Sequence, residues 1–507
     1  MKEHIFRNKE QIISKFLLFL VSILFLSFVA VSTSPLTEFY GWDSSYFMLV
    51  GQGIAKDMVP YRDFFDMKGP FLYFIEYLSQ LLCWGRAGCF WMEVFHLTIS
   101  LWITDEIYRL ASSRKYTVLR WLCFLPVLFV ASFSFEHGNL TEEYSLPWLL
   151  FSVYLVCRYI KNAEATGNYE HPLLMGFYHG VAFGIMAMIR INNAAFIGAI
   201  LLSVTIGLIT SKQFLNILQN GCVFLLGTAA AVLPFFLWYF AKGQLSEMLN
   251  QVFLFGVQYS SQTGIIPKLY MMYNIRYLHL PAVLPLLVAI IYRIRSWRTW
   301  LLSLAALLLA AVAINMGFGL IHYIALLIPN LVFGLYLWLG CCYKTAAEES
   351  NCCRRTKYSI IVLFLCAMCV LMLRNPDVIG TYQHKVSTFT GKEWDVWGKS
   401  QVDEIVSQIP PDEQDHVYAY GTGISCSRWY VMAGLFPPIR YCDWQQSYIN
   451  MRPEIGNELA DWLKQDGIWL VTDKNYTFTP QQIADVVAEN YTEYFSNESY
   501  TLYRIIE

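Results

Sequence analysis

The chain has 507 residues, of which 56% are hydrophobic and 17% aromatic, while only 15% are charged. Soluble domains average about 25% charged residues, so this composition indicates a membrane protein. The formal net charge of -2 provides no basic surface for a nucleic acid, and the aromatic content excludes a disordered chain.

The first apolar run covers residues 16–31 and follows the basic residues Lys2, Arg7 and Lys9. A secretory signal peptide has the same layout, but residues 32–35 (Ser-Thr-Ser-Pro) are a poor cleavage site. We therefore predict an uncleaved first membrane helix, and its basic flank places the N-terminus in the cytoplasm.

Further apolar runs are long enough to cross a bilayer, which takes roughly 17 to 25 residues. They cover residues 88–110, 117–135, 144–160, 172–189, 193–210, 218–241, 278–295, 299–316, 322–342 and 358–374. With the first helix they predict about eleven transmembrane helices. The loops then assigned to the cytoplasm hold more Lys and Arg than the outer loops, as the positive-inside rule requires, and an odd count places the C-terminus outside.

The apolar stretch from Phe71 to Trp84 is short and contains Glu76, Ser79 and Gln80. Counting it as a span would turn every later basic loop outward, against the positive-inside rule. We therefore predict an amphipathic helix in the outer interface, within a first outer loop of residues 35–87.

After about residue 375 polar residues increase and no run is long enough to span. Residues 417–421 and 469–472 have strand patterns, and residues 455–465 and 480–490 have helical ones. The sequence thus predicts a transmembrane domain over residues 1–374 and a small extracytoplasmic α/β domain over residues 375–507.

The first outer loop contains Asp43, close to the end of the first span, and then Asp63, Asp66 and Lys68. A carboxylate at the membrane surface is costly unless a proton, cation or ligand compensates it, so Asp43 is a candidate functional group. It is equally suited to cap the helix that follows. Asp63 and Asp66 also fit as loop acids, and Lys68 as an interfacial lysine.

The second outer loop concentrates Glu136, His137, Glu142 and Glu143 in a short turn, where Thr141 is expected to cap a helix. An ordinary helix start accounts for one of these acids but not for the cluster.

Arg190 lies where two spans meet outside, and an arginine at that depth needs an anionic partner. His322 and Tyr323 open another span at the same level. The long outer loop 241–277, with Gln251, Gln258, Tyr259 and Gln262, is a candidate lid, or else a plain connection.

This arrangement resembles the GT-C glycosyltransferases that use polyprenyl-phosphate-linked sugars, especially protein O-mannosyltransferases and lipid A aminoarabinose transferases. The resemblance covers residues 1 to about 374 and rests on Asp43, Lys68-Gly69-Pro70, the acids of the second outer loop and His322-Tyr323. The family usually has Asp-Glu where this chain has Asp43-Ser44, and Lys-Pro-Pro where it has Lys68-Gly69-Pro70.

The resemblance implies an inverting transferase on the outer membrane face, with a polyprenyl-phosphate sugar as donor and a glycan, lipid or protein as acceptor. Its implied site residues are Asp43 as general base with Glu136 and Glu142; Lys68, Arg190 and His322 for the donor phosphate; and His137, Glu143, Asp63, Asp66 and Tyr323 as substrate contacts. No cofactor is expected, although oligosaccharyltransferases of this fold suggest the alternative of a divalent metal (Mg²⁺ or Mn²⁺) between Asp43 and Glu142.

The competing interpretation is a multi-span transporter or flippase, for which repeated halves with broken helices at the midplane are typical. This chain has no visible internal repeat, and its polar residues gather at one face. The expected location is a bacterial plasma membrane, because no eukaryotic targeting segment is visible.

Overall fold

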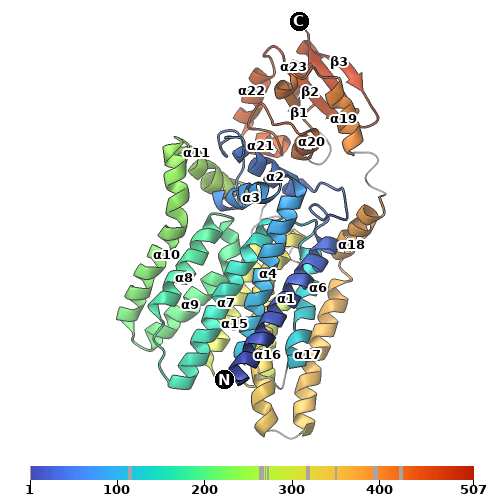
Figure 1. Cartoon of the computed structure of the whole chain (residues 1–507). Coiled ribbons are helices and arrows are strands. Elements are labelled where there is room, and N and C mark those ends of the chain that lie inside the picture. The colour runs from blue at the N-terminus through green and yellow to red at the C-terminus, as the bar shows by residue number, and fades with distance from the viewer. Residues whose placement is uncertain are drawn as a thin grey trace.

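Long helices lie side by side in the computed structural model of the chain and form one bundle (Figure 1). The structure describes residues 2–111, 117–261, 268, 270, 273–315, 320–348, 351–391, 398–421 and 426–506. The bundle consists of α1 (Lys2–Val29), α4 (Arg86–Ala111), α5 (Thr117–Leu122), α6 (Phe124–Ser134), α7 (Thr141–Thr166), α8 (Leu173–Ala187), α9 (Ala195–Thr210), α10 (Phe214–Ala241), α14 (Leu280–Ile291), α15 (Trp297–Asn315), α16 (Ile328–Glu348) and α17 (Asn351–Met372). Each apolar run predicted as a span coincides with one of these helices, or with α5 and α6 together.

Seven helical stretches in the described part of the chain are long and apolar enough to cross a membrane. They are Glu10–Val29, Thr117–Ser134, Ile191–Thr210, Phe214–Ala241, Trp297–Asn315, Ile321–Cys342 and Arg355–Met372. The chain is therefore a multi-pass membrane protein. Two shorter apolar stretches, Leu173–Ala187 and Arg276–Ile291, and the charged 26-residue helices α4 and α7 occupy the other predicted spans. A total of eleven crossings remains a prediction.

The helices differ in how much protein surrounds them. In α10 only 6% of the most apolar 18-residue stretch is buried inside the protein. In the helical stretch Ile321–Cys342 the corresponding share is 83%. α10 packs tightly on α8, since a Cβ on Gly180 would lie 2.0 Å from the Phe224 carbonyl oxygen. Its other side exposes Leu215, Leu218 and Leu225, as expected for a face that contacts lipid.

Two short helices, α2 (Trp42–Ile54) and α3 (Pro70–Leu82), lie at one end of the bundle, beneath the C-terminal domain (Figure 1). α3 confirms the helix predicted over residues 71–84. Its Glu76 and Ser79 are fully buried in the protein, while Phe74 and Leu81 are exposed. The polar side of this amphipathic helix therefore faces the protein interior, not water.

Both predicted helix caps are displaced by one or two residues. α2 begins after Gly41, which leaves Asp43 inside the first turn, and α7 begins after Leu140, so that Thr141 is its first residue and not its cap. A Cβ on Gly41 would lie 2.1 Å from Ser32 Oγ, so a side chain at the position that precedes the helix would require the Ser32 hydroxyl to move.

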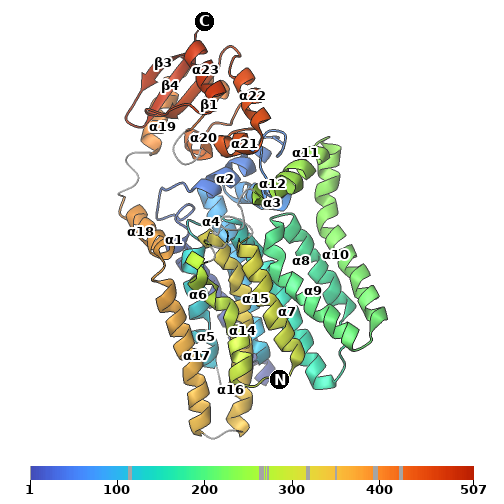
Figure 2. The same ribbon diagram turned by 180° about the vertical axis from the view of Figure 1, so that it is seen from behind.

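The C-terminal domain contains a four-stranded mixed sheet in the order β1-β2-β4-β3. Its strands are β1 (Val417–Ala419), β2 (Trp469–Asp473), β3 (Tyr491–Ser496) and β4 (Tyr500–Ile505), with β1 and β2 parallel and the other pairs antiparallel. The helices around the sheet are α19 (Lys399–Ser407), α20 (Cys426–Ala433), α21 (Gln445–Met451), α22 (Pro453–Trp462) and α23 (Gln481–Asn490), whereas α18 (Pro376–Phe389) packs on α6 of the bundle. Figure 2 shows this domain over the end of the bundle that carries α2 and α3, with the N-terminus at the opposite end.

Candidate active site

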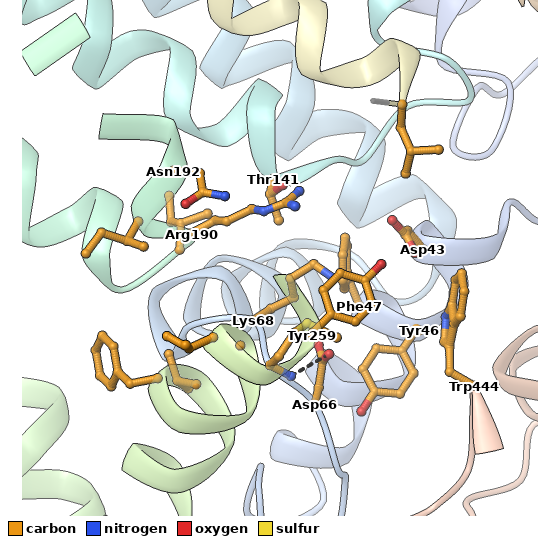
Figure 3. A pocket seen from close by; sticks show the side chains of 18 of the residues that line it. Asp43, Tyr46, Phe47, Asp66, Lys68, Thr141, Arg190, Asn192, Tyr259 and Trp444 are labelled. Carbon is orange, nitrogen blue, oxygen red and sulfur yellow. Dashed lines mark hydrogen bonds between the residues drawn. The ribbon is translucent and has the colours of Figure 1, made fainter. Parts of the chain in front are cut away.

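A cavity of about 290 Å³ lies where the bundle, the outer helices and the C-terminal domain meet. Figure 3 shows side chains from these separate elements pointing into it. Its polar lining includes Asp43, Asp66, Lys68, Thr141, Arg190, Asn192, Tyr259, His322, Tyr323, Trp444, Ser447 and Tyr448. Residues far apart in the sequence therefore share one hollow.

Main-chain hydrogen bonds bring Lys68 and Arg190 together. The amide of Gly69 donates to the Ile189 carbonyl at 2.9 Å, and the amide of Phe71 donates to the Met188 carbonyl at 2.8 Å. These bonds join the residues beside Lys68 to those immediately before Arg190. The loops that carry the two cations thus form one rigid unit.

Lys68 is a half-buried cation. Its Nζ lies 5.7 Å from the centre of the Phe47 ring, and the Tyr61 hydroxyl donates to its carbonyl oxygen at 2.6 Å. Burial alone would lower the pKa of the ammonium, but the carboxylates of Asp66 and Asp43 outweigh burial and raise that pKa. Lys68 is therefore positively charged at neutral pH.

Arg190 is held by two partners. It donates to Glu142 Oε1 at 3.3 Å and to the Tyr323 hydroxyl at 2.6 Å. Burial opposes its charge, yet Tyr323 and Glu142 raise the pKa of the guanidinium above its ordinary value. The side chain of Arg190 remains 18% exposed, whereas that of Glu142 is only 1% exposed. Within this ion pair, Arg190 is therefore the residue that a ligand in the cavity can contact.

His322 is the third basic group of the lining. Its Nδ1 lies 3.3 Å from a carboxylate oxygen of Glu136. Burial would raise the pKa of the Glu136 carboxyl, but the contacts with His322 lower it below its usual range. Glu136 is therefore a carboxylate that orients the imidazole from behind the cavity wall.

Two acids face the cavity directly. Asp43 lies in the first turn of α2 and is partly exposed, a position in which the helix dipole stabilises a carboxylate. Asp66 is buried and accepts hydrogen bonds from the Tyr73 hydroxyl and from the Met67 amide. The carboxylate of Asp66 therefore has its hydrogen-bond partners within the protein, whereas the carboxylate of Asp43 can contact a ligand.

Not all of the residues predicted as site members line the cavity. Lys68, Arg190, His322, Tyr323, Asp43 and Asp66 do, while Glu136 and Glu142 lie one layer behind as partners of His322 and Arg190.

The other predicted substrate contacts lie elsewhere. The His137 ring lies edge-on to the His384 ring, with 4.5 Å between their centres, and burial lowers the pKa of the His137 imidazole to about 3. Asp63 pairs with Arg62 at 2.7 Å and caps the Val59 amide. Glu143 is buried next to Glu93 and Lys385. Local sequence cannot distinguish such internal partners from ligand contacts.

Two further parts of the chain form walls of the cavity. Sequence analysis left the role of the first part open and did not predict the second. One comes from the outer loop 241–277, where α11 (Leu245–Leu249), a π-helical turn (Asn250–Phe255) and α12 (Gly256–Ser261) supply Val252 and Tyr259. Gln262 of this loop lies outside the described residues. The other wall comes from α21 of the C-terminal domain and contains Trp444 and Ser447.

A bridging metal between Asp43 and Glu142 does not fit these contacts. Glu142 is almost fully buried and engages Arg190 and Thr141 Oγ1, so it presents no carboxylate oxygen to the cavity. Among the described residues, no group of three or more His, Cys, Asp or Glu side chains is arranged to hold a metal ion.

The chain was compared with known proteins. No family model matches it, and no curated protein matches its sequence. Its structure is similar to the crystal structure of ArnT from Cupriavidus metallidurans bound to undecaprenyl phosphate, with a TM-score of 0.58 and 13% identity over 96% of this chain and 97% of that chain. The apo state of ArnT from the same organism gives 0.54 and 14%, with the same coverage.

A weaker match is the apo oligosaccharyltransferase from Archaeoglobus fulgidus, with a TM-score of 0.45 and 11% identity over 90% of this chain and 69% of that chain. At these identities the ArnT likeness shows the fold. The prediction of a mostly helical membrane fold with a small C-terminal α/β domain is confirmed by it.

Proposed function

We propose that this protein is a membrane glycosyltransferase that moves a sugar from a polyprenyl phosphate to an acceptor on the outer face of the membrane. The observation that carries the proposal is the junction of Lys68 and Arg190, two half-buried cations whose segments are joined by main-chain hydrogen bonds and which both line the cavity that contains Asp43. Two cations without a full set of carboxylate partners form a site for an anion. The ArnT structure with undecaprenyl phosphate, which shares this fold, supports a lipid phosphate as that anion.

The reaction follows from this arrangement. An acceptor nucleophile attacks the anomeric carbon while the bond from that carbon to the phosphate oxygen breaks, with inversion. Asp43 takes the proton of the nucleophile, and the polyprenyl phosphate leaves with the bonding electrons. Lys68 and Arg190 stabilise the negative charge that develops on the leaving phosphate, and His322, oriented by Glu136, adds a hydrogen-bond donor.

The proposal includes a topology. The N-terminus lies in the cytoplasm, eleven helices cross a bacterial plasma membrane, and the cavity with the C-terminal domain lies outside. The two termini at opposite ends of the molecule support this arrangement (Figure 1).

The test is the purified protein with Asp43→Asn, given a polyprenyl-phosphate sugar. We expect turnover to fall by about 10²-fold to 10⁴-fold while undecaprenyl phosphate still binds. The matched control is Asp57→Asn, an exposed carboxylate of the same loop in a left-handed conformation that Asn tolerates. Undiminished turnover by Asp43→Asn would remove the assigned base.

Phosphate binding is tested separately with Lys68→Ala and Arg190→Ala. We expect each to weaken undecaprenyl phosphate binding by about 10-fold to 100-fold, the value of a charge-assisted contact. Lys56→Ala, which removes an exposed lysine of the same outer loop, is the control and should bind normally. Unchanged affinity in both site variants would contradict a phosphate site here.

A further inference from the structure

Trp444 is an unusual residue in the wall of the cavity. Its side chain is 48% exposed, although tryptophan is otherwise a residue that folding buries. Its main chain has φ 53° and ψ 24°, a left-handed conformation that residues with large side chains rarely adopt. Strained backbone of this kind gathers at functional sites.

The surroundings hold Trp444 in this conformation. Its amide donates to Asp443 Oδ1 at 3.0 Å, and the buried Asp443 also accepts from Ser427 Oγ at 2.8 Å. One turn later, Tyr448 is buried against Phe65 of the first outer loop, with 4.9 Å between the ring centres. The protein thus fixes both ends of the first turn of α21 and leaves the indole in the cavity.

The cavity has two chemically different sides. Arg190 and Asn192 supply cationic and amide groups, and Figure 3 draws them to the left of Asp43 and Trp444, which share the other side of the view. In an inverting displacement the nucleophile approaches opposite the leaving phosphate. The side with the base is therefore the acceptor side, and Trp444 belongs to it.

We propose that Trp444, with Ser447, forms the acceptor subsite and that it binds a carbohydrate ring of the acceptor. This rests on the proposed function. The apolar face of an indole fits the C–H face of a pyranose, while Ser447 and Asp43 provide the hydrogen-bonding groups that sugar hydroxyls need.

Other acceptor chemistries fit this wall less well. A hydrocarbon chain would take the Asp43 carboxylate out of water without offering it a hydrogen-bond donor. An extended peptide is commonly bound along the edge of a sheet, whereas the cavity lining in the described chain consists of helices and loops. A sugar ring matches both the indole and the polar groups beside it.

The experiment uses the full-length protein in nanodiscs loaded with undecaprenyl phosphate. Saturation-transfer NMR measures the binding of a panel of methyl glycosides to the wild type and to Trp444→Ala, Trp444→Phe and Trp444→Asn. We expect about tenfold weaker binding in the Ala and Asn variants, and binding close to wild type in Trp444→Phe. Asn favours the left-handed conformation, so Trp444→Asn removes the indole without adding backbone strain.

Trp84→Ala is the matched control, because Trp84 is 54% exposed and does not line the cavity. Equal binding by wild type and Trp444→Ala overturns the inference. Binding of Ser/Thr peptides in place of all the glycosides, or no glycoside binding by the wild type, also overturns it. An oligosaccharide and a short-chain glycolipid, compared in the same assay, distinguish a soluble from a lipid-linked source of the sugar.

Undecaprenyl phosphate binding separates this inference from the proposed function. Trp444→Ala should bind the lipid phosphate as the wild type does, whereas Lys68→Ala should not. Suppose that Trp444→Ala loses glycoside binding while Lys68→Ala and Arg190→Ala still bind undecaprenyl phosphate normally. This result would contradict the phosphate site but support the carbohydrate subsite at Trp444.

Discussion

Gly69 lies so close to Met188 that a Cβ atom built on it would be 2.2 Å from the Met188 carbonyl oxygen. No real Cβ atom tolerates such an approach. The glycine next to Lys68 is therefore required for the main-chain junction with the segment that leads into Arg190.

Gly69→Ala should separate the two loops. We expect a loss of about 1–3 kcal/mol of stability, as for overpacking, and weaker undecaprenyl phosphate binding although both cations remain. Thermal unfolding and a lipid binding assay measure these effects. Gly221→Ala in α10, where a Cβ would meet no atom within 4 Å, is the control and should be neutral or slightly stabilising. A Gly69→Ala variant that binds normally would show that the junction is dispensable.

Glu142→Gln tests the buried partner of Arg190. The variant keeps the shape of the side chain but removes the charge that compensates the guanidinium, so we expect a loss of about 3 kcal/mol, at the lower end for a buried pair. Asp403→Asn makes the same change in a pair with Lys399 in which both side chains are more than half exposed, and should cost only about 0.5 kcal/mol. The free energy of unfolding is measured by chemical denaturation. Equal losses in the two variants would mean that the charge of Arg190 does not need Glu142 as its partner.

Lys385 predicts a pH dependence of stability. This residue of α18 donates to the Ser132 carbonyl at 2.8 Å, and burial lowers the pKa of its ammonium from 10.5 to about 7, against the opposing effects of Glu143, Glu136 and Glu93. Between these two values the unfolded chain binds a proton that the folded protein has released. Raising the pH from about 7 to about 10 therefore favours the folded state through this group.

The measurement is the unfolding temperature across that range for the wild type and Lys385→Met. The variant should lose the part of the increase that comes from this lysine. Lys399→Met, which removes an exposed lysine of α19, should follow the wild type. Parallel curves for wild type and Lys385→Met would show that Lys385 does not change its protonation on folding.

The sequence predicted the positions of the long helices because the length of an apolar run is a local property. Even α4, with the buried Glu93 and Asp105, was found in this way. Helix starts were less accurate, since α2 begins after Gly41, which packs closely on Ser32, and not after a residue with a capping side chain. The hairpin of β3 and β4 was missed, although Asn497, which accepts from the amides of Ser499 and Tyr500, marks its turn.

Several charged residues of the cavity lining were among the predicted site residues, but the limits of the cavity were not predicted. Lys68, Arg190 and His322 were recognisable because a cation at the membrane surface is costly wherever the chain folds. His137 and Glu143 have the same local appearance, yet their partners are His384 and Lys385, more than two hundred residues away in the sequence. Trp444 is the opposite case: it lines the cavity but was not predicted as a site residue. A tryptophan in a soluble segment does not indicate a site until the C-terminal domain is placed over the cavity.

The C-terminal domain is bonded directly to the segments that form the cavity. The Phe65 amide donates to the Arg440 carbonyl at 2.9 Å, and Arg452 donates to Gln258 at 3.1 Å and to Asn250 at 3.2 Å. Deleting residues 375–507 would thus unseat loops from the membrane half as well. Anyone grafting this domain onto another scaffold must transplant the stretches around Phe65 and Gln258 with it.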